Sequence, residues 1–157
     1  MHTLFTILTA IGTLSSLVLS QNGNITILNK CDFPIWVWTI GPPENQNVML
    51  QPEGQYVEAI YSSLGDIDIK VTVTPNGLLT PEPYMSLSYN IHEENIYYTL
   101  INVFGDPLFP KAVSLYPLES TSHECRGMRW PSGLPSNSRY KRNFCPTNKS
   151  LYLLLCT

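Results

Sequence analysis

Carboxylates are the side chains of this sequence that could do acid–base chemistry. Asp66 and Asp68 lie two residues apart, so a strand would place both on one face, and glycoside hydrolysis needs two carboxylates about 5–10 Å apart. Solvated carboxylates on a strand face show the same pattern, and Asp106 precedes Pro107, where an Asp commonly forms a turn. We therefore predict no catalytic residue.

Nucleophilic, metal-dependent and phosphate-binding chemistries lack their usual motifs in this sequence. No G-x-S-x-G elbow surrounds a serine, neither His92 nor His123 stands in H-E-x-x-H, and no glycine-rich phosphate loop is present. The cysteines include no C-x2-C pair with nearby histidines, which a zinc site would show. We predict neither a metal nor a cofactor.

Aromatic residues are the better candidates for binding. Trp36 and Trp38 would share one strand face, whereas the neighbours Tyr97 and Tyr98 would point to opposite faces, leaving one of them exposed. Exposed rings match the C–H faces of a pyranose, and buried rings fill a core, which is the interpretation that we favour for the two tryptophans. The candidate ligand-binding residues are Trp36, Trp38, Tyr97, Tyr98, Asp106 and Trp130.

The first twenty residues are predicted to be a cleaved signal peptide. Residues 4–19 contain no charge, and sixteen residues are short for a membrane span, which needs roughly 20. Val18 and Ser20 suit the positions before a cleavage site. No second stretch of this kind follows, so we expect no membrane contact after cleavage and a protein that is extracellular or in the cell wall.

Export would place the four cysteines in an oxidising compartment. All four follow residue 20, and an even number there predicts two disulfides, for which three pairings are possible. Two N-glycosylation sequons, beginning at Asn24 and Asn148, would then be exposed to modification.

Composition narrows the class of protein further. Only 13% of the 157 residues are charged, which argues against disorder and against a coiled coil. The net charge of -3, without a surplus of Lys and Arg, argues against a nucleic-acid partner. We expect a single domain over residues 21–157, acting as a monomer.

The hydrophobic pattern is that of short β-strands separated by turns. Residues 66–74 (DIDIKVTVT) alternate apolar and polar, as in a strand with one wet face, and no window shows a helical period free of Pro or Gly. A hairpin loop is predicted at residues 92–95. Predicted strands cover residues 25–28, 34–40, 66–74, 85–91, 96–103, 111–116 and 151–156. Strands at this spacing indicate a sandwich or a barrel.

Several segments also carry a family resemblance. In chain order they are residues 29–38 (NKCDFPIWVW), 70–78 (KVTVTPNGL), 102–109 (NVFGDPLF), 125–133 (CRGMRWPSG) and 151–156 (LYLLLC). Together they resemble the fungal antigenic thaumatin-like proteins, also known as the Blastomyces yeast-phase-specific protein family. The cysteine-rich signature and the many disulfides of the related plant thaumatins are missing.

The resemblance implies an all-β, thaumatin-like antiparallel β-sandwich stapled by two disulfides. It pairs the first cysteine with the last, which gives Cys31–Cys156 and Cys125–Cys145. The first bond would close a loop of more than a hundred residues, worth up to about 4–5 kcal/mol in the chain-entropy model.

The function expected from this resemblance is binding outside the cell. We expect a small secreted, non-enzymatic protein whose partner is either a cell-wall polysaccharide or a host protein. Two alternatives stay open, an endo-β-glucan hydrolase and a structural or antigenic component of the wall.

Overall fold

The computed structural model describes residues 22–41, 46–118, 125–135 and 142–157, so the predicted signal peptide lies outside the described residues. The described chain contains β-strands and no helix, and hence no helix that could cross a membrane. The strands are β1 (Asn24–Asn29), β2 (Ile35–Ile40), β3 (Gln46–Leu50), β4 (Gln55–Ala59), β5 (Ile67–Thr72), β6 (Tyr84–His92), β7 (Asn95–Val103), β8 (Val113–Pro117), β9 (Met128–Trp130), β10 (Asn143–Pro146) and β11 (Leu151–Leu155).

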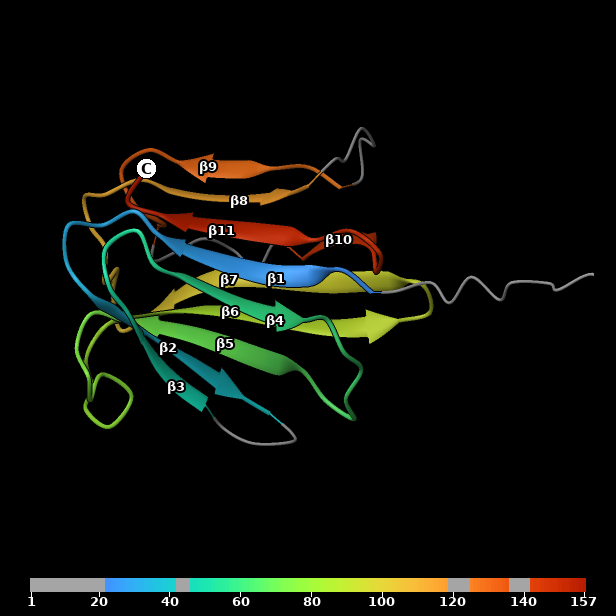
Figure 1. Ribbon diagram of the computed structural model, residues 1–157, viewed down its shortest axis with the longest axis horizontal. Coiled ribbons are helices and arrows are strands. Elements are labelled where there is room, and N and C mark those ends of the chain that lie inside the picture. Colours follow the sequence, from blue (N-terminus) through green and yellow to red (C-terminus); the bar gives the residue numbers. More distant parts are fainter. Residues whose placement is uncertain (1–21, 42–45, 119–124, 136–141) are drawn as a thin grey trace, which may run out of the picture.

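These strands form two sheets that stack face to face (Figure 1). One sheet has five strands in the order β4-β1-β11-β8-β9, and the other has six in the order β10-β7-β6-β5-β2-β3. Strands β1 and β11 pair in parallel, and the other strand pairs in the described residues are antiparallel. The predicted all-β sandwich is confirmed, with one parallel pair at the centre of the five-stranded sheet.

The core lies between the sheets and follows from the two-residue period of the strands. In β2, Ile35 and Val37 are buried while the residues between them are half-buried, and β11 alternates in the same way. The inward side chains that are fully buried include Ile25, Ile27, Ile67, Ile69, Leu87, Tyr89, Ile96, Tyr98, Leu115 and Leu153. Most of the strands therefore direct one face toward the core and the other toward the surface.

The hairpin predicted at residues 92–95 is confirmed. Strand β6 ends at His92 and β7 begins at Asn95, so the turn is formed by Glu93 and Glu94. Glu93 has a φ of 56°, in the left-handed region that such tight turns require. The two nine-residue strands of this hairpin are the second and third strands of the six-stranded sheet, counted from β10.

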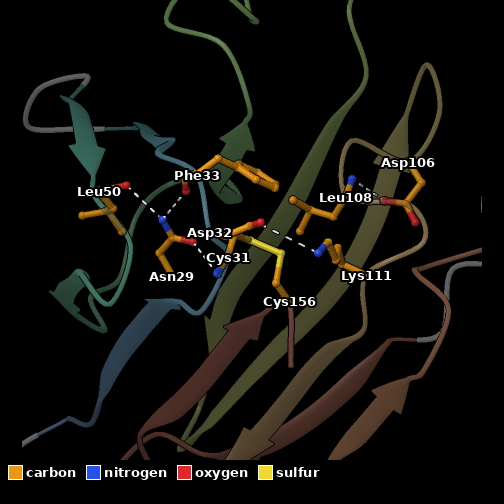
Figure 2. Close-up of a disulfide and its surroundings, with 9 residues drawn as sticks. All are labelled: Asn29, Cys31, Asp32, Phe33, Leu50, Asp106, Leu108, Lys111 and Cys156. Atoms are coloured by element: carbon orange, nitrogen blue, oxygen red, sulfur yellow. Dashed lines mark hydrogen bonds and ion pairs between the residues drawn. A yellow bond between two sulfur atoms is a disulfide. The ribbon is translucent and has the colours of Figure 1, made fainter.

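Both disulfide pairings implied by the resemblance are confirmed. Cys31 follows β1 and Cys156 follows β11, and because these neighbouring strands run in parallel, both cysteines emerge at the same end of the sandwich, with Cα atoms 4.9 Å apart (Figure 2). The second bond joins Cys125 to Cys145 on β10, with Cα atoms 4.7 Å apart.

Asn29 organises the chain around the first disulfide (Figure 2). Its side chain is fully buried, its Nδ2 donates to the carbonyl oxygens of Phe33 and Leu50 at 3.0 Å each, and its Oδ1 accepts the backbone N–H of Cys31 at 3.0 Å. One side chain thus satisfies three backbone groups where the chain leaves one sheet and enters the other.

Candidate functional site: a groove on the six-stranded sheet

Outward-facing side chains of the six-stranded sheet stand in rows across its strands. One row contains Asp68, Ser88 and Thr99, which are opposite one another on β5, β6 and β7. The next row, about 7 Å nearer the β6–β7 turn, contains Asn90 and Tyr97. Strand alternation therefore collects polar groups from three strands at one end of this face.

Two adjoining hollows lie over these rows and form what we call the groove. Their volumes are about 440 and 300 Å³, and both are lined by Asp66, Asn90, Tyr97 and Arg142. Arg142 directly precedes β10, the strand beside β7, and Asp66 directly precedes β5. The groove is therefore built from segments far apart in the sequence.

A chain of hydrogen bonds links a carboxylate, an amide and a guanidinium group along the groove. Asn90 Nδ2 donates to Asp66 Oδ1, and Asn90 Oδ1 accepts from Arg142 Nη2 at 2.8 Å. These bonds orient the three groups and use only part of their capacity, because a carboxylate has about four acceptor positions and a guanidinium has five N–H donors. The remaining positions are available to a polar ligand.

Aromatic side chains form the wall of the groove. The Arg142 guanidinium lies 5.1 Å from the Tyr97 ring centroid, within cation–π range. Phe144 on β10 stacks on Tyr97 with ring centroids 5.7 Å apart, and the His92 ring meets Tyr97 edge-on at 6.4 Å. These contacts restrict the position of the Tyr97 ring.

The Asp68 row supplies further polar atoms beneath the groove. Ser88 Oγ donates to Asp68 Oδ1. Thr99 Oγ1 is buried and has no hydrogen-bond partner among the described residues, although Thr99 lines the smaller hollow. A buried hydroxyl without a partner is costly in a stable fold, and a ligand or water molecule in this hollow would satisfy it.

Trp36 and Trp38 lie on the same outer face, which differs from the core position that we favoured from the sequence. Both are half-buried, because the inward positions of β2 belong to Ile35 and Val37. Trp38 Nε1 donates to Thr72 Oγ1 at 3.0 Å, and Trp38 stands in a row with Lys70 and Ser86, next to the Asp68 row. The face therefore continues from the groove into an aromatic region.

The three other predicted ligand-binding residues are buried or lie elsewhere. Tyr98 borders the smaller hollow, but it is 1% exposed and points into the core, with its Oη 3.6 Å from Cys145 Sγ. Asp106 accepts the Leu108 N–H at 2.9 Å in a turn near the first disulfide (Figure 2), as expected for a turn former. Trp130 is half-buried on β9 of the other sheet.

Sequence reasoning did not select Arg142 or Asn90 as site residues. Asn90 carried a signal, because Ser86, Ser88 and Asn90 alternate with apolar residues along β6 and so mark its wet face. No local pattern marks Arg142. Among the described residues, no group of three or more His, Cys, Asp or Glu side chains could hold a metal ion.

A second polar cluster, centred on Glu58, joins the two sheets at one edge of the sandwich. Glu58 on β4 accepts hydrogen bonds from Tyr56 Oη at 2.6 Å, from Thr39 Oγ1 at 2.8 Å and from Tyr89 Oη at 3.2 Å. Thr39 and Tyr89 belong to the six-stranded sheet. Because the carboxylate is already surrounded by donors of this chain, we assign this cluster a structural role.

We expect the fold to lose stability at alkaline pH, because the phenol groups of three tyrosines are buried or half-buried. Burial, followed by the hydrogen bond to Glu58, raises the pKa of Tyr56 to about 12. Burial alone raises the pKa of Tyr98 to about 12. Burial, together with the charge of Glu58, raises the pKa of Tyr89. Since the unfolded pKa is about 10, this stability is fully present below pH 10 and is lost as the pH rises through the folded values.

The Tyr98→Phe variant tests this expectation, because Tyr98 is buried and its phenol lies against the Cys145 sulfur. A shift of two pKa units corresponds to up to about 3 kcal/mol at high pH. We expect alkaline unfolding, followed by near-ultraviolet circular dichroism and tyrosinate absorbance, to have a higher midpoint pH in the variant. An unchanged midpoint would show that ionisation of Tyr98 does not contribute to unfolding.

Fold and site together define a disulfide-tied, thaumatin-like β-sandwich with a polar and aromatic groove on its larger sheet. The family model described as Bys1, Blastomyces yeast-phase-specific protein, matches residues 13–157. The chain therefore belongs to this family, as its segments suggested.

Individual relatives are distant. The chain is 22% identical over 145 residues to an antigenic thaumatin-like protein of Arthroderma benhamiae, covering 85% of this chain and 71% of that protein. Among solved structures it resembles the protein elicitor MoHrip2 from Magnaporthe oryzae, with a TM-score of 0.66 and 20% identity over 86% of this chain and 99% of that one. It also resembles the thaumatin-like xylanase inhibitor TLXI, with a TM-score of 0.54 and 14% identity over 85% and 99% of the two chains. These structural similarities establish the thaumatin-like fold.

Proposed function

We propose that this protein is a non-enzymatic, extracellular binding protein whose ligand is a neutral cell-wall polysaccharide held in the groove. The observation that carries the proposal is the hydrogen-bonded array of Asp66, Asn90 and Arg142 beside the Tyr97 ring. Sugar hydroxyls both donate and accept hydrogen bonds. The array offers them a carboxylate acceptor and a guanidinium donor beside an aromatic ring.

The charges of the groove favour a neutral sugar over an anionic one. Within the groove the Asp66 carboxylate is matched by the Arg142 guanidinium, and both groups form a hydrogen bond with Asn90. An anionic polysaccharide would meet the Asp66 carboxylate, whereas neutral hydroxyls can donate to a carboxylate and accept from a guanidinium.

The relatives support a binding protein over a hydrolase. Relatives of this fold include proteins described as an elicitor, an antigen and an inhibitor. The two disulfides agree with an oxidising, extracellular location.

The proposal is tested by retention of the purified protein on insoluble β-glucan, chitin and mannan, followed by calorimetric titration with a soluble oligosaccharide of the retained polymer. The Arg142→Ala variant loses a charged hydrogen-bond donor of the groove. We expect its affinity to fall about 10- to 100-fold, as for the loss of 1.5–3 kcal/mol.

Arg129→Ala provides the matched control, because Arg129 is an exposed arginine on β9 of the opposite sheet. It removes the same charge and should leave the affinity unchanged. Equal losses in the two variants would mean that net charge, not the groove, governs binding. If none of the three polymers retains the protein while a host protein does, the polysaccharide proposal is wrong.

A further inference from the structure

The outer face of the five-stranded sheet carries a cluster of apolar and aromatic side chains. Its outward side chains include Leu28 on β1, Val57 on β4 and Leu154 on β11, and Val57 is 51% exposed. Tyr152 and Tyr116 stand beside them, with ring centroids 5.7 Å apart and planes at 12°. We call this set of five residues the apolar face. An uncovered face of this kind is commonly an interaction surface.

One of the two sequons begins on this same face. Asn24 opens β1, its side chain is exposed, and strand alternation directs it outward together with Thr26 and Leu28. Thr26 is paired with Tyr152 on one side and with Val57 on the other. Asn24 is therefore a diagonal neighbour of both, about 8 Å away by strand spacing and rise.

We propose that Asn24 carries an N-linked glycan and that the first sugars of this glycan cover the apolar face, stacking on Tyr152 and Val57. The inference rests on the export that the proposed function requires, but not on the groove. A lipid-linked diphosphate oligosaccharide would donate the glycan. The bond from its anomeric carbon to the diphosphate breaks, a bond to Asn24 Nδ2 forms, and the displaced amide proton leaves with the diphosphate.

The chemistry of the face suits an amphipathic sugar. The C–H faces of a pyranose pack on aromatic rings while its hydroxyls remain in water, so a glycan rooted at Asn24 would remove apolar surface from solvent without burying unsatisfied polar groups. Beyond the tyrosines the face continues into a shallow hollow of about 360 Å³, lined by Tyr116, Leu154, Ser114 and Arg129 among others. This hollow gives a longer glycan a continuous path across the sheet.

The second sequon lies in a different setting and provides a control. Asn148 is exposed in the turn between β10 and β11, where the Lys149 N–H donates to the Pro146 carbonyl at 3.0 Å. This turn lies at the end of the sandwich, outside the rows of the apolar face. A glycan on Asn148 would extend into solvent.

The test expresses the full chain in an N-glycosylating yeast as wild type, Asn24→Gln, Asn148→Gln, Tyr152→Thr and the Asn24→Gln/Tyr152→Thr double variant. Intact-mass measurement should show a glycan that Asn24→Gln removes. We expect the melting temperature to fall by about 3 °C in Asn24→Gln relative to wild type, as for a contact of about 1 kcal/mol, and to be unchanged by Asn148→Gln. In the Tyr152→Thr background the Asn24→Gln substitution should lower the melting temperature by less, because only the contact with Val57 remains to be lost.

Binding of a hydrophobic dye to native protein gives a second measurement that does not require the double variant to fold. Dye fluorescence should rise in Asn24→Gln and not in Asn148→Gln. An unmodified Asn24 in the secreted protein would overturn the inference. The inference would also be overturned if Asn24→Gln lowered the melting temperature equally whether or not Tyr152 is replaced. Equal dye binding by Asn24→Gln and Asn148→Gln would overturn it as well. None of these measurements involves polysaccharide binding, so this inference and the proposed function can fail separately.

Discussion

Replacing both Cys31 and Cys156 by alanine is expected to lower the free energy of unfolding by about 5 kcal/mol. The bond closes a loop with a sequence separation of 125 residues, and the chain-entropy model assigns about 4.7 kcal/mol to a loop of about 100 residues. It also holds the ends of β1 and β11 together, the parallel pair at the centre of the five-stranded sheet. The measurement is urea unfolding of wild type and variant purified from the same host.

The second disulfide supplies the control for this prediction. Cys125 and Cys145 are separated by 20 residues, for which the same model gives about 3 kcal/mol. The Cys125→Ala/Cys145→Ala variant should therefore be more stable than the Cys31→Ala/Cys156→Ala variant. The reverse order would show that local packing around each bond, rather than loop length, determines its contribution.

Asn29→Asp is expected to destabilise the fold by about 3–5 kcal/mol at neutral pH. The buried Nδ2 of Asn29 donates to two carbonyl oxygens, those of Phe33 and Leu50 (Figure 2), and the substitution would place a carboxylate oxygen against both. A buried anion facing acceptors is among the most unfavourable changes that a single substitution can make. Thermal or urea unfolding measures the loss.

Acidic pH and a second substitution separate this effect from others. Burial beside carbonyl oxygens would raise the pKa of the introduced carboxyl group, so part of the lost stability should return as the pH falls through that raised value and the group gains a donor proton. Asn22→Asp is the matched control, because Asn22 is exposed although its Nδ2 also donates to a carbonyl, that of Ile60 at 3.0 Å. We expect it to cost less than about 1 kcal/mol. A similar loss in both variants would contradict the role assigned to burial.

Strands in the interior of each sheet could be predicted from the sequence, and the edge strands could not. The predicted runs correspond to β1, β2, β5, β6, β7, β8 and β11, all of which have neighbours on both sides. The strands without a prediction are β3, β4, β9 and β10, which are the four edges of the two sheets. Edge strands are short and less buried, so their apolar alternation is weak, and β4 reads QYVEA with no fully buried residue.

The candidate site could be predicted only in part from the sequence. Tyr97 could be named as a candidate ligand-binding residue because it lies in a β-rich run, and Asp66 could be recognised as a carboxylate on a strand face. Arg142 contacts Asn90 across 52 positions of sequence, and Asp66 contacts Asn90 across 24. Strand order and register create these neighbours, and neither is encoded in a local pattern.

The sequence by itself determined the class of fold, the turn at residues 92–95 and, through the family resemblance, both disulfide pairs. Alternation with a period of two residues is a local property that depends on side-chain type alone. The tertiary structure decided which of the two faces of each strand meets the other sheet, and so placed Trp36 and Trp38 outside and Tyr98 inside. It also joined Asp66, Asn90 and Arg142 into one groove, because cross-strand neighbours depend on how all the strands pack together.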